Sequence, residues 1–101
     1  MATFNDIIQQ HPLVLVDFSA TWCGPCQMLA PILKDLKEHY KDQLSVIKID
    51  VDKNNVLAAS YRVQGVPTLI LFQNGQQVWR QSWVLTLPNL IEVVEPHLHA
   101  H

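Results

Sequence analysis

The stretch SATWCGPCQM, residues 19–28, holds the only two cysteines of the chain, Cys23 and Cys26, with Gly-Pro between them. It follows a continuous apolar run, LVLVDF at 13–18, and precedes a segment in which apolar residues recur at helical spacing. The valine-rich run predicts a strand buried on both faces, and the spacing predicts a helix over 25–41. The cysteines are therefore expected where a strand's carboxyl end turns into a helix, the place at which open α/β sheets usually carry an active site.

The segments on either side alternate between helix and strand patterns. Helical patterns cover 3–11, 54–61 and 86–98, and extended patterns cover 45–51, 66–72 and 76–83. The QNG at 73–75 predicts a tight hairpin into an antiparallel last strand. We therefore expect an α/β fold in one domain, residues 1–101, with a mixed central sheet and helices on both of its faces.

Composition argues against several classes of function. Of the 101 residues, 49% are hydrophobic, and the net charge of -2 comes from 7 basic and 9 acidic residues without a run of either sign. That pattern argues against nucleic acid and anionic lipid as partners. The sequence shows neither a secretory leader pattern nor an apolar run long enough to span a membrane, so we expect a cytoplasmic protein. In that reducing compartment a cysteine pair is more often catalytic or metal-binding than structural.

The position predicted for Cys23 favours redox chemistry. A sulfur at a helix start lies among unpaired N–H groups at the positive end of the helix dipole, which stabilises the thiolate over the thiol. Cys26, expected one turn further along and more buried, lies close enough to form a disulfide with it. Cys23 would attack a partner's disulfide and Cys26 would resolve the mixed disulfide. Gly24 would allow close approach, and Pro25 would stiffen the turn.

Two other interpretations of the cysteine pair stay open from the residues alone. A zinc site needs four ligands, and the candidates for the others are the histidines of HLHAH at 97–101, far along the chain. The cysteines could also be inert core residues, although Gly-Pro is a poor filler for a helix interior.

Asp17 is out of place in the first predicted strand. Burial of a carboxylate among apolar residues raises its pKa, which makes Asp17 a candidate general base for Cys26. Lys48, in the next predicted strand, is a candidate partner that would temper this shift. The alternatives are a carboxylate that caps the turn after the strand and a lysine on a solvated strand face.

Four blocks of sequence, taken in order, resemble the thioredoxin family. They are VDFSATWCGPC at 16–26, KIDVDKN at 48–54, GVPTLILFQNG at 65–75 and the final amphipathic helix. The resemblance implies a thioredoxin fold and a disulfide reductase in which Cys23 attacks and Cys26 resolves, with no bound cofactor and a redox-active disulfide between the two. The implied partners are protein disulfides and thioredoxin reductase, through which electrons would come indirectly from NADPH.

The resemblance also assigns residues around the cysteines. Pro67 matches the family's cis-proline, so the Val66–Pro67 bond should be cis, with the Val66 backbone offered to an extended substrate. Asp17 and Lys48 match the family's buried carboxylate and its lysine. The flat apolar surface that receives target proteins is matched by Trp22, Gly24, Pro25, Gly65, Val66 and Thr68.

Two features depart from the family pattern. The sequence begins where the family's first helix begins, so we expect a four-stranded sheet without the usual N-terminal edge strand. Residues 45–51 would then form an exposed edge, giving a monomer with some tendency to self-associate. Trp83 stands where the family usually has glycine beside the substrate groove, so its ring is expected to alter target choice.

The same residues also allow a function other than disulfide reduction. A binding module for one dedicated partner, built on Trp83 and the open edge with incidental redox activity, is the alternative function. A disulfide donor or isomerase is disfavoured by the Gly-Pro between the cysteines and by the missing export signal.

Overall fold

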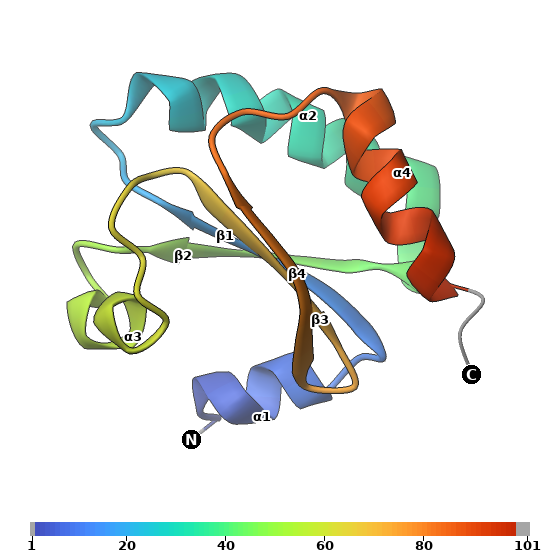
Figure 1. Cartoon of the computed structure of the whole chain (residues 1–101), viewed down its shortest axis with the longest axis horizontal. Helices are drawn as coiled ribbons and strands as arrows, with labels where there is room; N and C mark the ends of the chain where they lie inside the picture. Colours follow the sequence, from blue (N-terminus) through green and yellow to red (C-terminus); the bar gives the residue numbers. More distant parts are fainter. Residues whose placement is uncertain (1, 99–101) are drawn as a thin grey trace.

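The computed structural model describes residues 2–98 and shows one four-stranded mixed sheet in the order β2-β1-β3-β4 (Figure 1). β1 runs parallel to β2 and antiparallel to β3, and β3 runs antiparallel to β4. The elements in chain order are α1 (Phe4–Gln9), β1 (Leu13–Ser19), α2 (Gly24–Tyr40), the short 3-10 helix η1 (Lys41–Gln43), β2 (Ser45–Asp50), α3 (Asn55–Ser60), β3 (Thr68–Gln73), β4 (Gln76–Ser82) and α4 (Leu87–Leu98). The α/β fold, the four strands and the edge position of β2 confirm the expectations from sequence.

Helices cover both faces of the sheet, and each face has its own core (Figure 1). Because side chains alternate along a strand, Leu13 and Leu15 of β1 pack with α2 and α4, whereas Val14, Val16 and Phe18 pack with α1 and α3. Every residue of β1 is buried, as its continuous apolar run predicted. β1 is thus packed on both sides at the centre of the sheet, and this position fixes where the cysteine segment after it begins.

Local sequence signals define two element boundaries. The Thr3 hydroxyl accepts the Asp6 N–H at 3.1 Å, and the Asp6 carboxylate accepts the Thr3 N–H at 3.0 Å, which is a capping box at the start of α1. In the β3–β4 hairpin, Asn74 and Gly75 have φ of 51° and 81°. Positive φ at both central residues suits the right-handed twist of the flanking strands, which is why Asn-Gly is favoured there.

Two elements differ in detail from the sequence predictions. β3 begins at Thr68 and not at Val66, because Pro67 has no N–H to donate to the sheet. α2 continues through Pro31 and spans Gly24–Tyr40, one residue earlier at each end than the 25–41 expected from sequence. Within residues 2–98, no helix is both long enough and apolar enough to cross a bilayer.

Candidate active site at the start of α2

The two cysteines lie where β1 passes into α2, and they form a disulfide with a Cα–Cα distance of 5.2 Å. Cys23 is the N-cap residue of α2 and Cys26 lies one turn inside it, as predicted. Their burial does not separate their roles, because the exposed fractions are 4% for Cys23 and 3% for Cys26. Cys26 is the more buried of the two, as expected, but the difference is only between 3% and 4% exposure in the disulfide form. Position along the helix distinguishes the two.

The backbone of α2 points directly at the first sulfur. The N–H of Cys26 donates to Cys23 Sγ at 3.1 Å, so one of the unpaired donors of the helix N-terminus is satisfied by sulfur. A donor at this position and the positive end of the helix dipole both stabilise negative charge on Cys23 once the disulfide is reduced. Such surroundings lower the pKa of a thiol. Cys26 lies one turn further along the helix, does not occupy the cap and lacks this stabilisation.

The loop before β3 faces the disulfide. The Val66–Pro67 peptide bond is cis, as the family resemblance implied, and the Val66 carbonyl oxygen lies 3.7 Å from Cys23 Sγ. Val66 also packs beside both cysteines. Its backbone is therefore within reach of any chain segment that contacts the Cys23 sulfur.

Three further members of the expected target surface have different surroundings. A Cβ atom built on Gly24 or on Gly65 would meet no protein atom within 4 Å, so both glycines face open space. Thr68, in contrast, is buried, and its hydroxyl donates to the Gly65 carbonyl at 2.7 Å and contacts the Ser82 hydroxyl at 2.9 Å. The structure does not place the Thr68 side chain on the surface; it fixes the shape of the loop. Ser82 was not identified from sequence, because nothing in the pattern linked it to Thr68.

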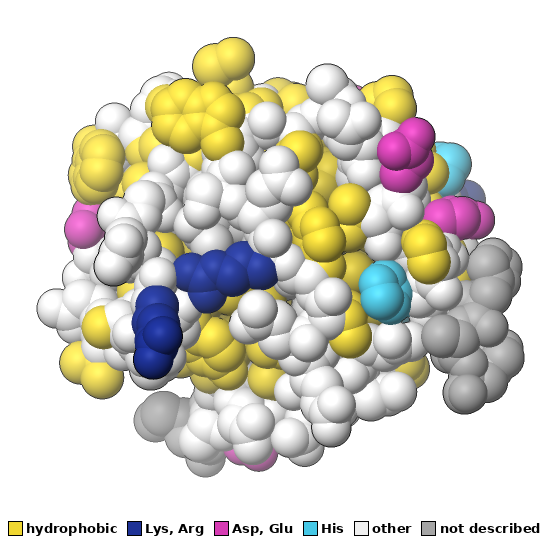
Figure 2. Space-filling view, viewed as in Figure 1, with side chains coloured by type: hydrophobic (Ala, Val, Ile, Leu, Met, Phe, Trp, Pro, Cys, Tyr) yellow, Lys and Arg dark blue, Asp and Glu magenta, His cyan; other side chains and the backbone are white. Residues whose placement is uncertain are grey.

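Exposed apolar side chains lie on segments that adjoin the disulfide and the cis-proline loop. Trp22 is 69% exposed and Trp83 is 61% exposed, so neither is a core residue. Figure 2 shows hydrophobic side chains gathered over the start of α2 and the segment after β4. The Trp22 indole N–H donates to the Asp52 carboxylate at 2.8 Å, which orients the ring. Sequence analysis missed Asp52, although it lies in the KIDVDKN block.

Trp83 adopts a backbone conformation that suits glycine. Its φ is 85°, in the left-handed region, and a bulky residue rarely adopts that conformation. The Trp83 N–H donates to the Pro67 carbonyl at 2.8 Å, so the residue follows directly beside the cis-proline loop. Trp83 is therefore an exposed residue that directly adjoins the cis-proline loop.

Asp17 lies beneath this surface and is only 2% exposed. Its Oδ1 has no hydrogen-bond partner in the described structure, so the carboxylate does not cap the turn after β1. Desolvation raises the pKa of Asp17 to about 6, and the positive charge of Lys48 partly offsets that rise. Asp17 and Lys48 are register partners on β1 and β2, and both line a cavity of about 260 Å³ against α2. Lys48 itself is exposed, so it is both a solvated lysine and the charge that faces Asp17.

The disulfide bears on the zinc-site and inert-core interpretations of the cysteines. The two sulfurs bond to each other, and within residues 2–98 no group of three or more His, Cys, Asp or Glu side chains could hold a metal ion. His99 and His101 of the C-terminal histidine segment lie outside the described residues. Two cysteines joined at the N-terminus of a helix are also not isolated core residues.

Comparison with known proteins gives a consistent result. A sequence model of the thioredoxin family matches residues 1–95. A thioredoxin-like protein of Synechocystis is 46% identical and covers 93% of this chain and 90% of its own length. A thioredoxin of Staphylococcus saprophyticus is 44% identical, with 96% of this chain and 92% of that protein covered. Among solved structures, a mutant thioredoxin of Halobacterium salinarum has a TM-score of 0.88 at 41% identity, covering 96% of this chain and 84% of that one.

Thioredoxins carry their electrons on a redox-active disulfide and need no bound cofactor. The position of the Cys23–Cys26 disulfide, the cis bond before Pro67 and the sheet order all agree with that chemistry. The chain therefore belongs to the thioredoxin family and is a protein thiol–disulfide oxidoreductase.

Proposed function

We propose that residues 1–101 act as a single thioredoxin domain that reduces protein disulfides, with Cys23 as nucleophile and Cys26 as resolving thiol. The observation that carries this assignment is the hydrogen bond from the Cys26 N–H to Cys23 Sγ at 3.1 Å. It gives the first sulfur, and not the second, the electrostatic support that a thiolate needs.

The reaction consists of two exchanges. The Cys23 thiolate attacks one sulfur of the target disulfide; a Cys23–target bond forms, the target S–S bond breaks, and the released target sulfur takes up a proton. Cys26 then loses its proton and attacks Cys23 Sγ, which forms the Cys23–Cys26 bond and releases the second target sulfur as a thiolate that is protonated in turn. The target gains two electrons and two protons. The domain supplies both electrons and the Cys26 proton, and the other proton comes from solvent, because Cys23 enters the reaction as a thiolate.

Asp17 is the group proposed to accept the Cys26 proton. A carboxylate whose pKa is raised to about 6 accepts a proton more readily near neutral pH than an ordinary aspartate does. Its unpartnered Oδ1 and its burial beside α2 support this role. Lys48 limits the shift, so that Asp17 remains mostly ionised, and therefore able to act as a base, at pH 7.

The target is proposed to bind across the surface formed by the start of α2, the cis-proline loop and the segment after β4. Gly24 and Gly65 leave open space, and the Val66 backbone offers hydrogen-bonding groups beside the sulfur. Apolar contact would come from Trp22, Pro25, Val66, Pro67 and Trp83. Thr68 contributes by holding Gly65 in place.

The oxidised domain must be reduced again before another cycle. Because the family holds its electrons on the disulfide alone, two electrons have to come from outside, and we propose thioredoxin reductase as their donor, with NADPH as the source. Reduction of this kind fits a cytoplasmic protein, since that compartment keeps thiols reduced.

The test is NADPH-coupled disulfide reduction with a thioredoxin reductase and a protein disulfide substrate. The wild-type chain should turn over, and Cys26→Ser should stall as a covalent Cys23–target disulfide, visible by mass spectrometry. Cys23→Ser is the matched control, because it retains Cys26 but should trap nothing. If the double Cys→Ser variant performed the biological role as well as wild type, a binding module would replace the proposed reductase.

A further inference from the structure

The two edges of the sheet differ in how they are protected against pairing. The outer strand β4 carries mostly exposed polar side chains and has a register irregularity opposite Leu71 and Phe72. Polar side chains and bulges are the features that discourage an edge strand from pairing with another chain. β2, at the other edge, has the sequence SVIKID, and its apolar residues Val46, Ile47 and Ile49 are only partly buried. Lys48 is the one basic residue along that edge.

The backbone groups that β2 leaves open can be derived from its pairing with β1. The Val51 N–H donates to the Ser19 carbonyl at 2.9 Å, and Ser19 is the register partner of Asp50. In a parallel ladder, alternate residues direct their backbone groups to the same neighbour, so Ile47 and Ile49 also face β1. The groups of Val46, Lys48 and Asp50 therefore face away from the sheet.

Not all of these outward groups are available. The Asp50 carbonyl already accepts from the backbone N–H and the side-chain amide of Asn54, both at 3.0 Å. Within residues 2–98, β2 has a strand partner on one side only. The N–H and C=O of Lys48 and the N–H of Asp50 consequently form a short free ladder.

We propose that this edge binds the same edge of a second copy of the chain, with the two β2 strands antiparallel around a two-fold axis at Ile49. In this register the Asp50 N–H of each copy donates to the Lys48 carbonyl of the other. The Lys48 N–H of each copy takes the place of the Asn54 side-chain amide at the opposing Asp50 carbonyl, whose two lone pairs Asn54 occupies in the monomer. The sheet then continues from one copy into the next.

Side-chain charges select this register over its neighbours. With Ile49 opposite its own copy, each Lys48 lies opposite Asp50 of the second copy, and Ile47 lies opposite Val51 on the other face. A shift that centres the axis on Lys48 puts two ammonium groups directly opposite each other, which is unfavourable. A shift that centres it on Ile47 places Lys48 opposite Val46 and loses both ion pairs. The contact is short, so the association is weak and reversible.

Hydrogen–deuterium exchange of the wild-type chain tests the proposal without any substitution. The amides of Lys48 and Asp50 should exchange fast in dilute protein and become protected as concentration rises, in step with dimer formation by sedimentation equilibrium. The Ile47 and Ile49 amides should be protected at every concentration, because they face β1. A chain that stays monomeric into the millimolar range, or a dimer in which the Lys48 and Asp50 amides still exchange fast, would overturn the proposal.

A matched pair of variants separates the edge from the fold. Lys48→Pro removes an N–H that β1 does not use, so the monomer should keep its sheet while the dimer is lost, because proline is tolerated at an edge position whose N–H faces solvent. Lys48→Ala keeps the N–H and should dimerise more weakly than wild type but more strongly than Lys48→Pro. A Lys48→Pro chain that is folded by circular dichroism and dimerises like wild type would contradict the proposal.

Discussion

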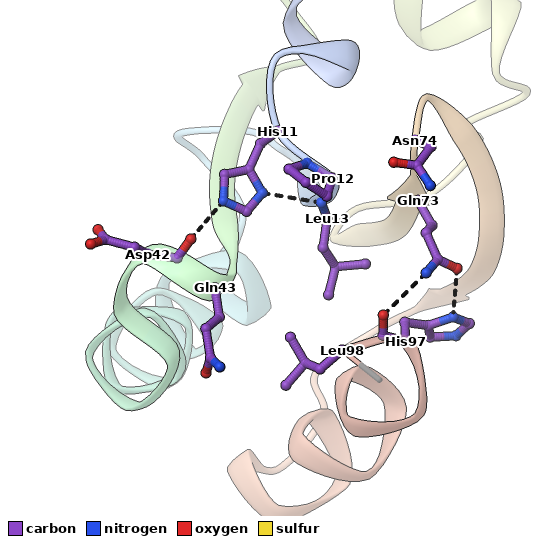
Figure 3. A pocket seen from close by; sticks show the side chains of 9 residues that line it. All are labelled: His11, Pro12, Leu13, Asp42, Gln43, Gln73, Asn74, His97 and Leu98. Atoms are coloured by element: carbon purple, nitrogen blue, oxygen red, sulfur yellow. Dashed lines mark hydrogen bonds between the residues drawn. The ribbon is translucent and has the colours of Figure 1, made fainter. Parts of the chain in front are cut away.

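Two pockets lie along β1, and neither is lined by the cysteines; the larger one lies at the amino end of the strand, away from them. The cavity at the amino end, about 580 Å³, is lined by residues from the start of β1, η1, the β3–β4 turn and the end of α4 (Figure 3). There, a His11 ring nitrogen lies 2.6 Å from the Asp42 carbonyl, and the Leu13 N–H donates to His11 Nδ1 at 3.1 Å. Gln73 and His97 pair through two contacts of 3.1 and 3.2 Å. The imidazoles at this end are therefore already engaged in structural contacts.

At the carboxyl end of β1, several polar groups are not engaged in structural hydrogen bonds. A helix donor points at Cys23 Sγ, and the buried Asp17 Oδ1 and Ser19 Oγ have no hydrogen-bond partner in the described structure. Trp83 has a glycine-type backbone conformation, and the indole of Trp22 is exposed. The comparison shows that volume does not identify the site. The site is identified by a helix donor that points at a sulfur, by buried polar atoms without partners and by a strained backbone. Each of these features lowers stability and is expected mainly where function requires it.

The largest expected effect comes from removing the sulfur that the helix supports. Cys23→Ser should abolish disulfide reduction to background, because no other thiol occupies the N-cap of α2. Insulin reduction followed by turbidity gives the measurement. Residual activity above about one hundredth of wild type would mean that Cys26 can start the exchange alone, and the asymmetry between the two cysteines would be lost.

Substitution of Asp17 should lower the rate at which the mixed disulfide is resolved but raise the stability of the fold. Asp17→Asn should slow release of the mixed disulfide about a hundredfold, as for loss of a general base. Folding raises the Asp17 pKa from 3.8 to about 6, so the folded state binds the proton more tightly and the stability of the wild type falls as pH rises between these values. Above about pH 6 the ionised, buried carboxylate lowers the free energy of unfolding by about 3 kcal/mol. An asparagine at this position avoids part of that loss.

Urea unfolding at pH 7.5 and at pH 3.5 measures the second effect. Asp17→Asn should be the more stable chain at pH 7.5, and the difference from wild type should shrink at pH 3.5, where the carboxyl is fully protonated in the folded state and mostly protonated in the unfolded state. Asp35→Asn, an exposed position on α2, is the control and should show no comparable pH dependence. Equal stability of the Asp17 variant and wild type at both pH values would remove the argument from desolvation.

Trp83→Gly should have a smaller effect on each property. Glycine adopts the left-handed conformation without strain, so the substitution should raise the free energy of unfolding by about 1 kcal/mol, measured in urea. Non-glycine residues in sparsely populated regions cost on the order of 1–3 kcal/mol. Asn74→Gly is the matched control, because asparagine tolerates its φ of 51° and little should be gained. The relative reduction rates of several protein disulfides should also change severalfold, and an unchanged order and ratio would exclude Trp83 from target choice.

The smallest effect on activity is expected at the amino end of β1. His11→Ala removes two hydrogen bonds and should cost about 1–2 kcal/mol of stability, but disulfide reduction should stay within about twofold of wild type. Thermal unfolding and the insulin assay on the same sample measure both. A large loss of activity in a folded His11→Ala chain would show that the two ends of β1 are coupled.

Sequence reasoning reached the fold and the cysteines because their signals are local. The apolar run before Cys23, the helical spacing after it, the Asn-Gly turn and the capping box at Thr3 each act through neighbouring residues. The cis bond at Pro67 came only from the family resemblance, because the residues themselves allow either isomer. Only the strand register shows that Asp17 and Lys48 lie opposite each other, because sequence spacing does not fix which strands are adjacent.

Other features could not be predicted because they depend on contacts between distant segments. Asp52 binds Trp22 across 30 residues, and Ser82 contacts Thr68 across 14. Thr68 was expected on the surface from its place in the motif, but it is buried because β1 and β4 cover the start of β3. The left-handed conformation of Trp83 was not predicted from the tryptophan itself; the glycine that the family usually has at this position was the only signal for it.

The most direct test of the account is the rate of alkylation of Cys23 in the reduced chain as a function of pH. With iodoacetamide and mass-spectrometric mapping, folded Cys23 should react at least about tenfold faster at pH 6.5 than Cys23 of the same chain unfolded in urea, where a thiol has a pKa of about 8.5. The titration midpoint of folded Cys23 should lie below that of the unfolded chain. Equal rates and midpoints in the two states would show that the start of α2 does not stabilise the Cys23 thiolate and would contradict the account.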